Sequence, residues 1–171
     1  MTIEEAIKMA LEYENNIRDI YYKGADQIKD QTINRFFRVL GDDEQSHVDY
    51  LEVKLIQWQE QGRIDSEVLK TSIPLKDDIA EGLDRVRSIV SEDLRGLVKR
   101  ALVSALEAEI ETSDFYKKMV EELPEEGKNM FKPFITIEEK HISTVQYELD
   151  SVNNSGYWFD FMEFDMEAIS S

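Results

Sequence analysis

The two histidines of this chain have the most informative spacing in the sequence. Each follows a glutamate by three residues: His47 follows Glu44, and His141 follows Glu138. Residues three apart on a helix lie on one face, so each Glu–His pair could bind one metal ion. Two such pairs, in the same order in two parts of one chain, are a stronger signal than a single pair. The spacing therefore indicates a site for two metal ions.

Four glutamates interrupt the apolar stripes of four predicted helices. They are Glu14, Glu44, Glu109 and Glu138. Burying an unpaired carboxylate costs several kcal/mol, so buried carboxylates are normally paired with cations or bound to metal. These stripes have too few lysines or arginines to pair with four acids, whereas two divalent cations would balance them. The predicted metal ligands are Glu14, Glu44, His47, Glu109, Glu138 and His141.

Four long helices must position these ligands. Helical periodicity predicts segments over about 2–29, 31–61, 92–122 and 124–152. Two short connections and one long one then predict an all-α four-helix bundle with a long crossover between the second and third helices. Pro133 should kink the fourth helix or delay its start. In the crossover we expect one short helix, near residues 76–89.

The two halves of the chain repeat each other. The sequence around Glu14 resembles that around Glu109, at an offset of 95 residues, and Tyr21 matches Tyr116 at the same offset. The two Glu–His pairs match at an offset of 94 residues. A duplicated helix pair explains both offsets. We expect one domain over 1–171, with the bundle over about 2–153 and a tail over 154–171.

Composition excludes several classes of function. The net charge of −17 argues against binding to nucleic acid or to an anionic membrane surface. The absence of cysteine excludes disulfides, iron–sulfur clusters and zinc knuckles. No apolar stretch approaches the ~20 residues of a membrane span, and the first residues do not resemble a signal peptide. The expected location is the cytoplasm.

The ligand pattern resembles the rubrerythrin branch of the ferritin-like superfamily, over about residues 3–152. The resemblance implies a ferritin-like bundle that binds two iron ions per chain, with manganese as the other candidate. It implies that Glu14 and Glu109 are outer or bridging ligands and that each Glu–His pair serves one iron. Tyr21 and Tyr116 resemble tyrosines that support the metal ligands in that family, with ordinary core tyrosines as the alternative.

Three departures from that family narrow the expected chemistry. Rubrerythrins proper have a rubredoxin module with four cysteines, so electrons must reach this chain from another donor. They also have a further glutamate where this chain has Thr112, which puts rubrerythrin-type peroxidase chemistry in doubt. Bacterioferritins place a haem-ligating methionine where this chain has Gln45, so no haem is expected. Asp43, like the exposed acids Glu12, Glu107, Glu111 and Glu139, is expected to lie off the inward stripe.

Three functions remain open on this basis. The first is an oxidoreductase that acts on peroxide or dioxygen with an external electron donor. The second is an iron-binding ferroxidase of the ferritin type, and the third is a bundle in which metal has a structural role.

The tail has four large aromatic residues within 158–164, too many to leave in water. We expect them to cover a homodimer interface or to fold back over the chain's own bundle.

Overall fold

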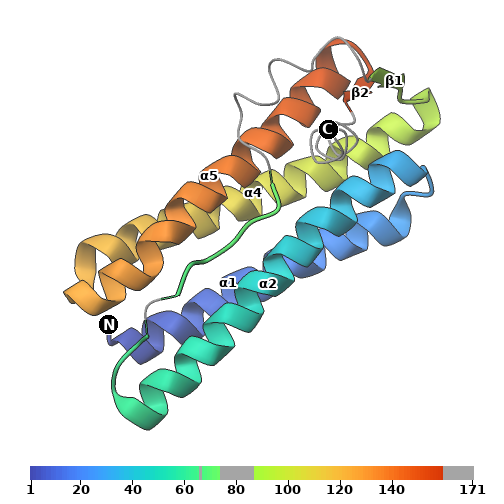
Figure 1. Cartoon of the computed structure of the whole chain (residues 1–171). Coiled ribbons are helices and arrows are strands. Elements are labelled where there is room, and N and C mark those ends of the chain that lie inside the picture. Colours follow the sequence, from blue (N-terminus) through green and yellow to red (C-terminus); the bar gives the residue numbers. More distant parts are fainter. Residues whose placement is uncertain (66, 74–86, 160–171) are drawn as a thin grey trace, which may run out of the picture.

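The computed structural model describes residues 1–65, 67–73 and 87–159. In these residues the chain forms four long helices: α1 (Ile3–Gln27), α2 (Gln31–Gln61), α4 (Glu92–Glu122) and α5 (Glu125–Asn154). Residues 62–91 connect α2 to α4. The predicted all-α four-helix bundle with a long crossover is therefore confirmed (Figure 1).

The helix ends are set by local chemistry. The backbone N–H of Glu5 donates to Thr2 Oγ1 (3.2 Å), and the backbone N–H of Thr2 donates to Glu5 Oε2 (2.8 Å), so α1 begins with a capping box. Asp30 caps α2 by accepting a hydrogen bond from the backbone N–H of Ile33 (3.0 Å). At the other end of α2, Gly62 takes the left-handed conformation (φ 64°) that suits glycine. α5 begins well before Pro133, so this proline does not delay the helix.

The helices pack as two pairs, α1 with α2 and α4 with α5 (Figure 1). Two glycines allow α1 and α2 to approach closely. A Cβ atom on Gly24 would lie 2.9 Å from the ring of Phe37, and one on Gly41 would lie 2.6 Å from the ring of Tyr22. Both rings thus pack directly against the backbone of the opposite helix, which fixes the spacing of this pair.

Two apolar clusters lie on either side of a polar layer in the bundle core. On α1, for example, Ile7 and Ala10 belong to one cluster and Ile17 belongs to the other, with Glu14 between them. On each of the other three helices, cluster ligands likewise lie between residues of the two apolar clusters. Apolar packing above and below the layer therefore holds its polar side chains inside the bundle.

A two-stranded ladder closes one end of the bundle. β1 (Arg87–Ile89) pairs antiparallel with β2 (Tyr157–Phe159), with Ser88 opposite Trp158. The prediction of a helix over 76–89 is thus wrong for residues 87–89, where pairing with the tail gives a strand. The rest of that segment lies outside the described residues.

The indole of Trp158 is buried in the chain's own core. It is 1% exposed and packs edge-on against Phe36, with 5.0 Å between the ring centroids. For this residue the tail folds back over its own bundle, which is one of the two alternatives left open above. The Phe159 side chain, Phe161 and Phe164 lie outside the described part of the chain.

The described part of the long connection runs back along α2 (Figure 1, green). Lys54 is fully buried and donates to the backbone carbonyl of Asp65 (2.8 Å) and to Glu67 Oε2 (3.0 Å). Further along the connection, Thr71 and Ser72 donate hydrogen bonds to Asp43 on α2. None of the described helices is long and apolar enough to cross a membrane.

Candidate metal centre

All six predicted metal ligands lie together in the polar layer. Each is 0% exposed. α1 supplies Glu14, α4 supplies Glu109, and the two Glu–His pairs come from α2 and α5. Each helix of the bundle therefore contributes to one buried cluster.

The six side chains form two overlapping groups that could each hold a metal ion. The first group consists of Glu14, Glu44, His47 and Glu138, and the second of Glu44, Glu109, Glu138 and His141. Within each group, one ligand atom from every residue lies within 4.8 Å of the others. Glu44 and Glu138 belong to both groups. They are thus the two carboxylates able to contact both ions.

The δ nitrogen of each histidine faces these carboxylates. His47 Nδ1 lies 2.9 Å from Glu44 Oε2 and 3.2 Å from Glu14 Oε2. His141 Nδ1 lies 2.7 Å from Glu44 Oε1 and 3.4 Å from Glu109 Oε1. The Nδ1 atoms are therefore the nitrogens placed to bind metal.

Two buried tyrosines support the outer carboxylates. The hydroxyl of Tyr21 on α1 donates to Glu109 on α4, and the hydroxyl of Tyr116 on α4 donates to Glu14 on α1. Burial and nearby carboxylates raise the pKa of both phenols well above the usual value, so both stay protonated donors. The two contacts are reciprocal between the repeated halves, and they place both tyrosines next to the cluster.

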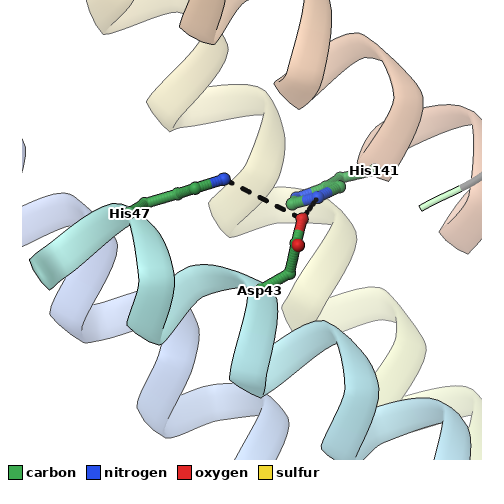
Figure 2. Close-up of side chains that lie close together, drawn as sticks. All are labelled: Asp43, His47 and His141. Atoms are coloured by element: carbon green, nitrogen blue, oxygen red, sulfur yellow. Dashed lines mark hydrogen bonds and ion pairs between the residues drawn. The ribbon is translucent and has the colours of Figure 1, made fainter. Parts of the chain in front are cut away.

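Asp43 was expected to lie off the inward stripe, and that expectation is wrong. Its side chain is buried, and Asp43 Oδ2 lies 2.8 Å from His141 Nε2 and 3.8 Å from His47 Nε2 (Figure 2). The residue lies three positions after buried Leu40 and four before His47, and that spacing places it on the inward face. Counting the positions beside the central apolar row of this helix as inward-facing would have predicted the burial of Asp43.

Asp43 is held as a carboxylate by its hydrogen bonds. Burial alone would raise its pKa, but hydrogen bonds from His141, Thr71 and Ser72 hold the pKa well below its usual range. Asp43 therefore stays charged between the connection and the histidines.

Without metal, the cluster balances its charge by holding protons. Burial and the carboxylates of Glu109 and Glu14 raise the pKa of Glu44 to about 7, against the opposing effect of the histidines. Burial and its carboxylate neighbours raise the pKa of Glu138 well above its usual value. Burial opposes protonation of His47, but Glu14 and Glu44 raise its pKa to about 10. Metal ions would displace these protons.

The donor set fits two divalent cations. Both carboxylate oxygens of Glu138 and one oxygen of Glu109 are buried without a hydrogen bond. Those of Glu44 are buried with the two histidine Nδ1 atoms beside them. In the described part of the chain no lysine or arginine forms an ion pair with any of the six residues. Buried carboxylates are normally neutralised by cations or metal. Carboxylate oxygens together with imidazole nitrogens are ligands that suit iron and manganese.

The other residues singled out from the sequence lie outside the two groups. Thr112 is buried, but its hydroxyl donates to the backbone carbonyl of Ala108 on its own helix (2.9 Å). Gln45 lies between Arg18 and Asp49, away from the cluster. As predicted, four further acids are exposed: Glu12, Glu107, Glu111 and Glu139.

Comparisons of this chain with protein-family models, with curated proteins and with solved structures find no match. The assignment of the cluster therefore depends on its own geometry. A four-helix bundle with this buried Glu/His cluster is consistent with a ferritin-like di-metal site.

Proposed function

We propose that this chain is a rubrerythrin-like di-iron carboxylate protein that acts as an oxidoreductase on peroxide or dioxygen. The observation that carries the proposal is the pair of buried ligand groups that share Glu44 and Glu138. Each group combines three carboxylates with one imidazole, which suits iron or manganese. A pair of iron ions that cycles between the ferrous and ferric states would supply two electrons to a small oxidant.

The burial of the cluster supports a small substrate. Because all six side chains are 0% exposed, a bulky organic substrate could not reach them without rearrangement of the helices. A surface pocket lies beside Asp43, lined by Asp42, Ser46, Thr71 and Ser72 among others. Peroxide and dioxygen, with two heavy atoms each, are the kind of substrate that this burial favours.

The residues of the chain have distinct roles in this proposal. Glu44 and Glu138 would contact both ions, while Glu14 and Glu109 would each contact one. Tyr21 and Tyr116 would orient those outer carboxylates, since supporting hydrogen bonds fix the position of metal ligands. The chain has no cysteine and thus no rubredoxin-type iron site, so electrons would come from an external donor.

Anaerobic loading with ferrous iron followed by peroxide tests this function. We expect uptake of two Fe²⁺ per chain and, on addition of one H₂O₂ per chain, rapid oxidation of both ions. Two Fe²⁺, one H₂O₂ and two protons give two Fe³⁺ and two molecules of water, so electrons balance. A reductant such as dithionite should then restore the ferrous state and permit a second turnover.

Matched variants make the result specific to the cluster. Glu138→Ala should abolish the rapid oxidation, whereas Glu139→Ala, one residue away and exposed, should retain it. Uptake of many irons per chain would favour a ferritin-type role instead. Bound metal that peroxide never oxidises would contradict the oxidoreductase and leave a structural role.

A further inference from the structure

Asp43 contacts the cluster from the side opposite to the metal-facing nitrogens. Its Oδ2 atom lies 2.8 Å from His141 Nε2 and 3.8 Å from His47 Nε2 (Figure 2). The same carboxylate accepts hydrogen bonds from Thr71 Oγ1 (2.6 Å), the Ser72 backbone N–H (2.9 Å) and Ser72 Oγ (3.1 Å). Asp43 is therefore fixed between the long connection and the two histidines.

The two histidines receive unequal support from this carboxylate. An N–H group at His141 Nε2 can donate to Asp43, so that Nδ1, which faces Glu44 and Glu109, is the nitrogen left to bind a metal ion. A carboxylate at this distance fixes the tautomer and makes the imidazole a more basic ligand. The distance of 3.8 Å from His47 is too long for such a bond. In the described residues His47 Nε2 is buried without a hydrogen-bond partner.

The sequence repeat explains why the support is one-sided. At the offset of 94 residues that relates the two Glu–His pairs, Asp43 corresponds to Ile137. Ile137 is apolar and 5% exposed, so the second half of the chain offers His47 no equivalent carboxylate. The predicted ligands and the two supporting tyrosines repeat between the halves, whereas Asp43 does not.

We propose that Asp43 is a positioning residue that makes the two metal positions unequal, so that the position formed by Glu109 and His141 fills first. This inference rests on the proposed metal centre and goes beyond it by assigning an order of binding. Removing a partner that supports a metal ligand typically weakens metal binding by 10–100-fold. The two binding steps of the native chain should therefore differ by about that factor.

Titration of the metal-free protein with Co²⁺ against a competing chelator, followed by visible absorption, measures the two steps. Glu14→Gln and Glu109→Gln show which ligand group each binding step fills, since Glu14 belongs only to the His47 group and Glu109 only to the His141 group. The tight step should survive in Glu14→Gln and disappear in Glu109→Gln.

Asp43→Asn then tests the role of the carboxylate. It should weaken the tight step by 10–100-fold, change the weak step much less, and bring the two affinities together. Asp42→Asn is the matched control, because Asp42 is the adjacent acid, is exposed and accepts a hydrogen bond from the hydroxyl of Tyr22. It should leave both steps unchanged.

A second variant keeps the test decisive if Asp43→Asn does not fold. Thr71→Val removes one hydrogen bond from the Asp43 carboxylate and should weaken the same tight step by a smaller factor. Two equal steps in the native chain, or equal weakening of both steps in these variants, would overturn the inference while leaving the metal centre intact. Failure of the native chain to bind Co²⁺ at all would overturn the metal centre as well.

Discussion

The imidazole rings of His47 and His141 lie parallel to each other, with an angle of 8° between their planes and 5.6 Å between their centroids. The two residues belong to different helix pairs and stand 94 positions apart in the sequence. Their Nδ1 atoms both face Glu44, and their Nε2 atoms both face Asp43. The two repeated halves thus meet at one cluster, in which each histidine faces carboxylates at both ring nitrogens.

The hydroxyl groups of the two buried tyrosines should matter for metal affinity. Tyr21→Phe removes the hydrogen bond to Glu109, and Tyr116→Phe removes the one to Glu14. Each variant should fold, because the ring is kept. It should weaken metal binding by about tenfold or more at the ligand group to which its carboxylate partner belongs. Co²⁺ titration measures the effect. Tyr13→Phe is the control, because the Tyr13 ring stacks on Phe115, away from the cluster. A loss of affinity in the control equal to that in the other two would contradict the prediction.

The stability of the metal-free protein should fall as pH rises. The pKa of Glu44 is raised from 4.5 to about 7 in the folded state, so its contribution is complete below pH 4.5 and is lost as pH rises through 7. The pKa of His47 is raised from 6.5 to about 10, so its contribution is lost between those values. The free energy of unfolding of the metal-free protein should therefore be lower at pH 9 than at pH 5.5, by a few kcal/mol. Denaturant unfolding at the two pH values measures it.

Bound metal should remove this pH dependence, because it neutralises the deprotonated carboxylates. Chemical unfolding of the loaded protein at the same two pH values provides the comparison. In the metal-free Glu44→Gln variant, the part of the stability loss that occurs between pH 4.5 and 7 should disappear. Metal-free protein as stable as the loaded form at neutral and alkaline pH would argue that the carboxylates are not buried ligands.

Trp158 should contribute strongly to the stability of the bundle. Its indole is 1% exposed and packs on Phe36, so Trp158→Ala should cost about 3–5 kcal/mol. Tyr157→Ala, at the 37% exposed neighbouring position, should cost much less. Equilibrium denaturation measures both, and equal effects would contradict the burial of Trp158. Light scattering on the same proteins tests the homodimer, which stays a prediction.

The sequence predicts most of this structure because each helix has a clear apolar period and a local stop signal. Gly62 and Thr2 mark helix ends through backbone conformation and capping, which depend on neighbouring residues alone. The four carboxylate ligands can be predicted because a carboxylate in an apolar stripe needs a partner. The two histidines can be predicted because each follows such a glutamate by three residues. Packing of the four helices into a bundle then brings the six side chains together.

Two features depend on contacts between distant segments, which helical periodicity does not show: the strand at residues 87–89 and the hydrogen-bond partners of Asp43. Residues 87–89 form a strand only by pairing with the tail, seventy residues further along the chain. Asp43 is stabilised inside the bundle by Thr71, Ser72 and His141, none of which is its neighbour in sequence. Helical periodicity alone cannot reveal that a buried aspartate has such partners.

Metal stoichiometry tests the central claim most directly. The native chain, purified, stripped of metal and then titrated with Fe²⁺ without oxygen, should bind two ions per chain. Glu44→Ala and Glu138→Ala should each lose stable binding of at least one ion, and the double variant should bind none, since both residues belong to both groups. The double control Glu12→Ala/Glu139→Ala changes two exposed acids and should still bind two ions. Two ions bound by the Glu44→Ala/Glu138→Ala protein would contradict the account.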